Sequence, residues 1–87
     1  MGRSSLQIDV ECYAGHRGEE TPRRFVLDGR TIEVAEVVDR WLAPEHRYFK
    51  LRDTRGSIWI LRHDTRLGRW ELIMYEAATA AGYQRSG

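Results

Sequence analysis

The stretch YFKLRDTRGSIWILRHDTRLGRWELIMY, residues 48–75, decides the fold of this chain. It holds three runs rich in aromatic, aliphatic and β-branched residues, separated by Arg55-Gly56 and by the segment DTRLG. Short runs of this kind between Gly-containing turns are typical of antiparallel strands. The middle run is apolar on both parities, which favours the centre of a sheet. We therefore predict a three-stranded meander whose core is formed by one tryptophan together with Phe49, Leu51, Ile58 and Ile60.

The residues before the meander predict further strands that close a sheet around it. Residues 6–13 alternate apolar and polar side chains, which indicates a strand with one buried face. A loop that holds two glycines ends near Pro22, and two β-rich runs then meet at Asp28-Gly29. Asp-Gly in this context is a strong hairpin signal, because a type I′ turn needs positive φ at both central positions. The sequence thus predicts an all-β fold of about six antiparallel strands.

The run after this turn, residues 30–41, changes its apolar phase partway along. Ile32 and Val34 share one parity, whereas Val37 and Trp41 share the other. A β-bulge near residues 35–36 explains the change, since one extra residue re-aims every later side chain. The alternative is a short helix near residues 35–42, because the apolar residues there also recur at helical spacing. The number of β-branched residues favours the strand.

A chain of 87 residues allows one domain with a small core. We expect a disordered N-terminus at residues 1–5, a single β domain at 6–76 and a tail at 77–87, where a helical turn at the C-terminus is the alternative. An open sheet of this size would expose an apolar face and two edges. We therefore expect a small, partly closed barrel or a strongly curved sheet. No apolar run approaches the ~20 residues of a membrane span, and no signal-peptide h-region is visible, so we expect a cytoplasmic protein without a membrane partner.

The sequence offers little that predicts catalysis or metal binding. Its soft metal ligands match none of the common zinc spacings, so we expect three surface histidines and one buried, inert thiol: His16, His46, His63 and Cys12. Ser57, His63 and Asp64 supply the residue types of a catalytic triad, but they cannot converge from one short strand. There is no Gly-rich phosphate loop. We expect no enzyme, no cofactor, no metal site and no small-molecule substrate.

The meander carries a local excess of positive charge, interleaved with aromatic residues. Residues 47–69 contain seven basic residues against two acidic ones, although the formal net charge of the whole chain is only +1. A curved sheet with stacking rings beside a basic groove is how small barrels bind single-stranded nucleic acid. The candidate nucleic-acid-binding residues are Tyr48, Lys50, Arg52, Arg55 and Arg62. The competing interpretation is that Trp59 and Trp70 form the core while the arginines pair with neighbouring carboxylates.

Protein interaction or self-association is the other functional hypothesis, and it is the one we favour from the sequence. The strand at residues 9–13, or the strand that ends at Tyr75, would leave an edge able to accept another strand. That strand would come from a second copy in a homodimer or from a protein partner. This hypothesis requires only the geometry of a small sheet, and nucleic-acid binding remains the alternative.

Five motifs resemble a small uncharacterised bacterial β-domain family: PRRFVLDGR (22–30), VxxVxDRW (34–41), YFKLR (48–52), GSIWILRHD (56–64) and GRWEL (68–72). The resemblance covers about residues 22–75. Similar short domains lie at the ends of, or are encoded near, proteins related to translesion (Y-family) DNA polymerases. The resemblance implies a DNA-binding or DNA-repair accessory domain with no catalytic residues and no cofactor.

Overall fold

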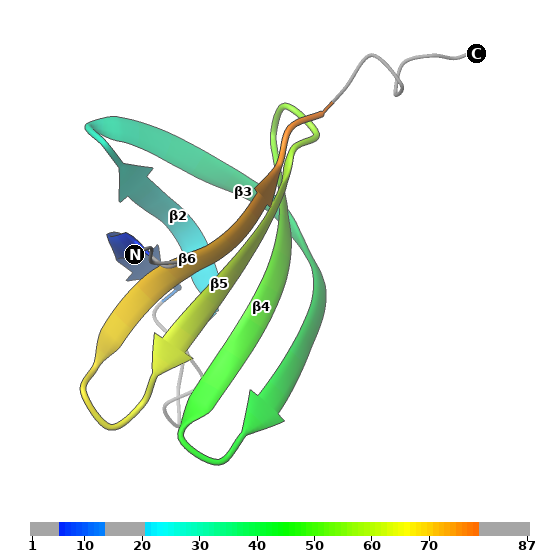
Figure 1. The fold of residues 1–87 in the computed structure, drawn as a ribbon. Helices are drawn as coiled ribbons and strands as arrows, with labels where there is room; N and C mark the ends of the chain where they lie inside the picture. Colours follow the sequence, from blue (N-terminus) through cyan, green and yellow to red (C-terminus); the bar gives the residue numbers. More distant parts are fainter. Residues whose placement is uncertain (1–5, 14–20, 79–87) are drawn as a thin grey trace.

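The computed structural model describes residues 6–13 and 21–78, which form a small closed β-barrel (Figure 1). Each strand pairs antiparallel with the next, and β1 closes the barrel against β6. The strands are β1 (Leu6–Cys12), β2 (Pro22–Leu27), β3 (Arg30–Ala43), β4 (His46–Asp53), β5 (Ile58–Asp64) and β6 (Arg69–Glu76). The predicted all-β fold of six antiparallel strands is confirmed. The expectations for residues 1–5 and for the C-terminal helical turn lie outside the described residues.

β3 is the strand that bends the barrel. Its first four residues pair with β2, whereas the residues from Val34 onward pair with β4. Register shifts between Val34 and Glu36 and between Val37 and Asp39 mark two β-bulges. The bulge predicted near residues 35–36 is therefore confirmed, and the alternative of a helix near 35–42 is wrong. Because a bulge bends and twists its strand, β3 can leave the β2 side and continue beside β4 (Figure 1).

The turn between β2 and β3 has the predicted Asp-Gly geometry. Asp28 has a φ of 55° and Gly29 a φ of 79°, so both central residues adopt the left-handed conformation of a type I′ turn. This turn matches the right-handed twist of the flanking strands. The β2–β3 hairpin therefore has a regular two-residue turn, and it projects beside the β4–β6 meander (Figure 1).

The barrel core differs from the prediction on β5. Trp59 and Leu61 point inward, while Ile58 and Ile60 are only partly buried. The pairing with β4 explains this, because residues directly opposite each other project to the same side, and β4 turns its own apolar face inward. Both meander tryptophans belong to the core, whose buried members are Ile8, Phe25, Phe49, Leu51, Trp59, Leu61 and Trp70.

His63 is also buried, so the expectation of a surface histidine is wrong for this residue, while His16 lies outside the described residues. Its imidazole stacks on Trp70 with ring centroids 4.2 Å apart and an interplanar angle of 8°. His63 shares the inward parity of Trp59 and Leu61, so the register that corrects β5 also places this ring inside. Cys12 packs against the core and is partly buried.

Closure of the barrel is uneven. β1 pairs with β6 through only three residue pairs, which join Leu6–Ile8 to residues 70–72. Within residues 6–13 and 21–78, the end of β6, residues 73–76, consequently has no strand partner on the side away from β5. The same holds for residues 34–43 of β3 on the side away from β4. The first gap opens the wall of the barrel, and the second leaves an edge.

Candidate binding sites on the barrel

Four of the five predicted binding residues share the outer face of the meander. Tyr48, Lys50 and Arg52 project outward because the residues between them on β4 point into the core. The β4–β5 register puts Arg62 directly opposite Tyr48, so it belongs to the same face. Arg55 lies apart from them, in the turn between β4 and β5.

Ion pairs neutralise much of this outer face. Arg62 donates to Glu71 Oε1 from Nη2 at 2.6 Å and from Nε at 2.8 Å, and this bond to Glu71 raises the pKa of the Arg62 guanidinium. Arg52 Nη1 lies 2.7 Å from Glu36 Oε1. Of the three cations, only Lys50 makes no ion pair with a residue that the structure describes. On the outer face, both arginines are therefore paired with carboxylates. For Arg62 this agrees with the competing interpretation, in which the arginines of the meander pair with neighbouring carboxylates.

Tyr48 is already stacked within the protein. Its ring lies 5.4 Å from the ring of Trp41 with an interplanar angle of only 4°. Trp41 is 40% exposed and the adjacent Leu42 is 77% exposed. The end of the β3–β4 hairpin thus carries an aromatic and aliphatic surface next to the unpaired edge of β3.

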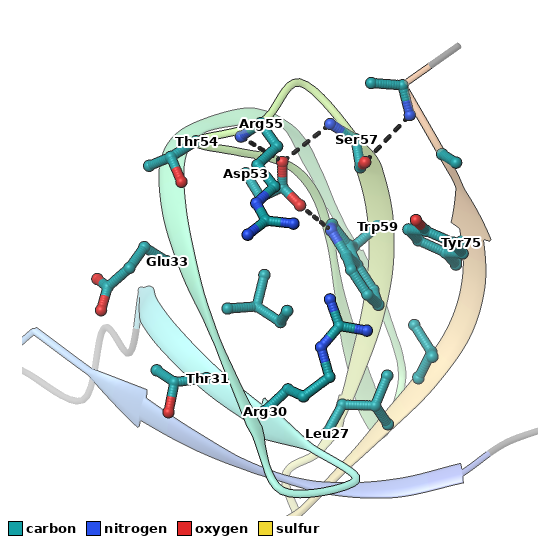
Figure 2. A pocket seen from close by; sticks show the side chains of 14 residues that line it. Leu27, Arg30, Thr31, Glu33, Asp53, Thr54, Arg55, Ser57, Trp59 and Tyr75 are labelled. Atoms are coloured by element: carbon teal, nitrogen blue, oxygen red, sulfur yellow. Dashed lines mark hydrogen bonds between the residues drawn. The ribbon is translucent and has the colours of Figure 1, made fainter.

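A cleft opens on the other side of the molecule, where β6 has no β1 neighbour. Its walls are the β2–β3 hairpin at residues 27–33, the β4–β5 turn with its flanking strand ends at 53–59, and the end of β6 with the two residues after it at 72–78 (Figure 2). The cleft has a volume of about 580 Å³. That size lies within the range of about 300–1,000 Å³ that is usual for ligand sites.

Aromatic rings form one wall of the cleft. The Trp59 indole is buried and packs edge-on against Phe25, with centroids 5.0 Å apart and an interplanar angle of 76°. The Tyr75 ring lies 4.2 Å from Trp59 at 40°, and Tyr75 is 50% exposed. The wall therefore has a fixed inner ring and an accessible outer ring.

Asp53 fixes this wall and the turn above it. Its Oδ1 accepts hydrogen bonds from the Arg55 and Ser57 backbone N–H groups at 2.8 and 2.9 Å, and its Oδ2 accepts one from Trp59 Nε1 at 2.9 Å. Burial alone would raise the pKa of the Asp53 carboxyl, but the bonds from Trp59, Ser57 and Arg55 outweigh it and lower that pKa. The Ala78 N–H donates to Ser57 Oγ at 3.0 Å and ties the end of β6 to the same turn.

Two cations point into the cleft from opposite elements. Figure 2 shows the guanidinium groups of Arg30, on the hairpin, and Arg55, on the turn, directed into the same hollow. Neither makes an ion pair with any residue in the described part of the chain. The two carboxylates that line the cleft are engaged elsewhere, since Asp53 accepts three N–H bonds and Glu33 Oε2 pairs with Arg24 Nε at 2.9 Å. The cleft therefore offers two guanidinium groups without an ion-pair partner among the described residues, beside an exposed ring.

The sequence pointed to only one of these cleft residues. Arg55 was predicted as a binding residue, but together with outer-face residues from which the structure separates it. Arg30 and Tyr75 were missed, because no local pattern brings a hairpin residue and the end of β6 together. Asp53 does carry a local signal, since an Asp at the start of a DTRG turn commonly bonds the backbone two residues on.

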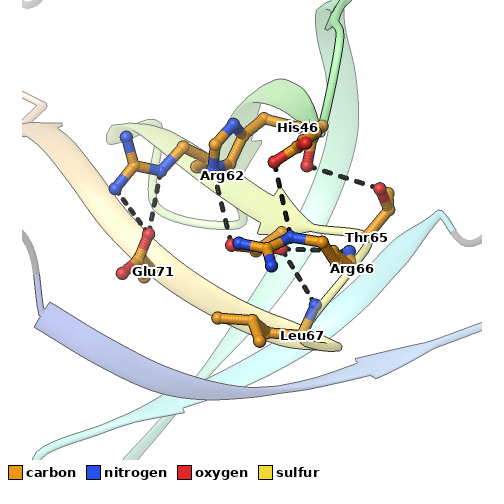
Figure 3. Close-up of polar contacts among 8 residues, drawn as sticks. His46, Arg62, Thr65, Arg66, Leu67 and Glu71 are labelled. Carbon is orange, nitrogen blue, oxygen red and sulfur yellow. Dashed lines mark hydrogen bonds and ion pairs between the residues drawn. The ribbon is translucent and has the colours of Figure 1, made fainter.

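The far end of the meander is a structural cross-link (Figure 3). The β3–β4 and β5–β6 turns are joined by an ion pair between Arg66 Nε and Glu45 Oε1 at 3.4 Å. Beside them, His46 Nε2 at the start of β4 lies 3.6 Å from Asp64 Oδ2 at the end of β5. Asp64 Oδ1 accepts the N–H of Leu67 at 2.9 Å and that of Arg66 at 3.0 Å, and the bond from Leu67 contributes most to lowering the Asp64 pKa. These groups hold the two turns together.

Known proteins supply no further guide to the site. No protein-family model, curated protein or solved structure matches this chain. The described residues include no group of three or more His, Cys, Asp or Glu side chains able to hold a metal ion, and no helix long and apolar enough to span a membrane. The molecule is thus defined by its geometry, as a small antiparallel barrel with an aromatic cleft lined by two arginines.

Proposed function

We propose that this chain is a non-enzymatic binding module whose cleft holds single-stranded nucleic acid. The supporting observation is that Arg30 and Arg55 point into one hollow whose wall ends in the exposed Tyr75 ring. Guanidinium groups recognise phosphate oxygens through paired hydrogen bonds, and aromatic side chains stack on unpaired bases. Single-strand binding needs both kinds of group side by side.

The cleft favours a single strand over a duplex. Tyr75 packs at a tilt against Trp59 within the wall of a hollow, so a base must leave its own stack to reach the ring. Bases in single strands are free to do so, whereas a duplex must first be unpaired, which costs free energy. The outer face of the meander is a weaker candidate, because Glu36 and Glu71 already pair with its two arginines.

The cleft also lacks the constellation of a hydrolase. The Asp53 carboxylate is fixed by three donors, and the Ser57 hydroxyl accepts the Ala78 N–H. Among the described residues no histidine or cysteine lines the cleft. A nucleophile within reach of a general base is the usual requirement for covalent catalysis, so the proposal is one of binding alone.

The test is a titration of a labelled single-stranded oligonucleotide, followed by fluorescence anisotropy at low and at moderate salt. The double variant Arg30→Gln with Arg55→Gln is expected to bind about tenfold more weakly or worse. Its salt dependence should flatten, by about 0.7 in the logarithmic slope for each phosphate group that the variant no longer neutralises.

The matched control is Lys50→Gln with Arg52→Gln, which removes the same charge from the outer face. It should change binding little. Equal weakening by both double variants would indicate nonspecific attraction to positive charge. A larger effect of the control would move the site to the outer face, and absence of binding at low salt would end the proposal.

A protein partner or a second copy of the chain is the second candidate. It is supported by the unpaired edge of β3 at residues 34–43 together with the exposed Trp41 and Leu42 side chains. Strand addition uses such an edge, with main-chain hydrogen bonds for affinity and alternate side chains for specificity. The two bulges interrupt the edge and limit a long ladder, which is why this candidate stands second.

Sedimentation velocity over a range of concentrations tests self-association. If β3 edges pair, the wild type forms a dimer that Leu42→Arg weakens, while Leu67→Arg, an exposed leucine on the β5–β6 turn, leaves it intact. A wild type that stays monomeric at the highest concentration contradicts self-association. A heterologous partner would then have to be sought by cross-linking.

The resemblance to domains associated with translesion polymerases adds a biological setting to the proposal. We propose on that basis that the strand bound is DNA exposed during repair, with the chain acting as an accessory domain. DNA and RNA oligonucleotides of the same sequence distinguish the cases. Preference for the RNA strand would contradict the role in DNA repair, but the proposal that the cleft binds a single strand would still stand.

A further inference from the structure

We infer that the cleft receives the phosphorylated end of a strand, with its terminal phosphate between Arg30 and Arg55 and the adjoining base against Tyr75. This inference rests on the proposed nucleic-acid function and names the part of the strand that enters. A free mononucleotide carries the same chemistry, a phosphate monoester next to an aromatic base. A competition experiment separates the two sources.

The charge in the cleft favours a terminal phosphate over an internal one. Two guanidinium groups that point into the same hollow repel each other, and the lining carboxylates are already engaged. An internal phosphodiester brings one negative charge and two free oxygens. A phosphate monoester brings a charge of about −1.5 to −2 near pH 7 and three acceptor oxygens, so it can satisfy two arginines at once.

The walls of the cleft favour an end over a passing strand. The β4–β5 turn stands over one end of the hollow, and the Ala78 N–H bond to Ser57 Oγ fastens the exit of β6 to that turn (Figure 2). Gly56 in the turn also lies next to Ala78, because a Cβ placed on Gly56 would lie 3.4 Å from Ala78 Cβ. Leu27 and Leu72 line the cleft as apolar residues that offer phosphates no partner. A strand that continued in both directions would have to pass these walls.

The aromatic wall supplies a place for one base. Trp59 is held by Asp53 and backs Tyr75, so the exposed ring has a rigid support behind it. Rigid aromatic groups bind at a low entropic cost, since few rotamers are lost. A volume of about 580 Å³ suits a nucleotide rather than several.

The experiment compares unlabelled oligonucleotides of one sequence as competitors: 5′-phosphorylated, 3′-phosphorylated, unphosphorylated and covalently circular, with the free mononucleotide as a fifth competitor. One phosphorylated end should compete about tenfold better than the unphosphorylated strand. The circular strand should compete no better than the unphosphorylated one. Arg30→Gln should abolish the phosphate preference, whereas Lys50→Gln should keep it.

Each contrary outcome has a distinct meaning. A circular strand that competes as well as the phosphorylated linear one overturns end recognition and leaves the proposed function standing. If a labelled mononucleotide binds in a direct titration while the labelled oligonucleotide does not, phosphate recognition stands and the proposed function is overturned. Failure of all five overturns both. Thermal unfolding of Arg30→Gln serves as the fold control, because Arg30 is exposed and should leave the melting temperature unchanged.

Discussion

At the scale of single residues, Asp53 is the group that fixes the positions of the cleft's aromatic wall and of the β4–β5 turn. It holds the Trp59 indole against the core and fixes the turn that presents Arg55. Its negative charge is buried, yet three N–H donors compensate it and the pKa of its carboxyl is lowered. Asp53 is therefore a positioning residue, and its effect on binding is indirect.

Asp53→Asn is expected to lower the free energy of unfolding by about 1–3 kcal/mol at neutral pH, because one buried N–H donor would face an amide N–H instead of an oxygen. Urea unfolding monitored by tryptophan fluorescence measures the change. Asp9→Asn is the matched control, since Asp9 is exposed on β1 and should change stability by less than about 0.5 kcal/mol.

The same variant predicts a pH dependence. The folded-state pKa of Asp53 lies below its ordinary value of 3.8, so the stability that its charge contributes is complete above that value. That stability is lost as the pH falls from about 4 through the lower folded-state pKa. The difference between the wild type and Asp53→Asn should therefore shrink in acid. A difference that stays constant from about pH 7 to about pH 2 would contradict this role.

At the scale of elements, the β2–β3 hairpin carries Arg30 to the cleft, and its turn depends on Gly29. No atom lies within 4 Å of a Cβ placed there, so any cost of substitution comes from the φ of 79° alone. Gly29→Ala should lower the free energy of unfolding by about 1–2 kcal/mol. Gly29→Asn should cost less, because Asn tolerates the left-handed conformation. Equal losses in urea unfolding would show that φ is not the cause.

The elements were largely predictable from the sequence, because strands and turns follow local patterns. The six strands, the Asp-Gly turn and the bulge at residues 35–36 all had such a signal. The second bulge, near Val38, had none, since an apolar residue at a bulge does not disturb the pattern visibly. The prediction that Ile58 and Ile60 face the core was wrong. Both faces of β5 are apolar, so only its register with β4 decides which face points inward.

At the scale of the whole molecule, closure of the barrel creates the cleft. Arg30, Arg55 and Tyr75 come from three separate elements, and they face one another because β1 covers β6 only as far as Leu72. No sequence pattern specifies where one strand stops covering another. The five binding residues predicted from the meander were grouped because they are close in sequence. The structure separates them, with Arg55 at the cleft and the other four on the outer face.

Closure can be tested on β1 itself. Ile8 is buried opposite Trp70 in the short β1–β6 ladder, so Ile8→Val should lower the free energy of unfolding by about 0.5–1.5 kcal/mol and Ile8→Ala by about 2–5 kcal/mol. Leu6→Ala on the same strand should have a small effect, because Leu6 is largely exposed. If Ile8→Ala and Leu6→Ala lower the free energy of unfolding equally in urea, the β1–β6 ladder does not close the core as described.

The central claim is that ligands enter the cleft and leave the outer face of the meander untouched. The most direct measurement is an NMR titration of the arginine Nε–Hε resonances with a 5′-phosphorylated single-stranded oligonucleotide. We predict that the resonances of Arg30 and Arg55 shift with saturation, while those of Arg52 and Arg62 stay in place because Glu36 and Glu71 hold them. Shifts confined to Arg52 and Arg62, or no shifts at all, would contradict this claim.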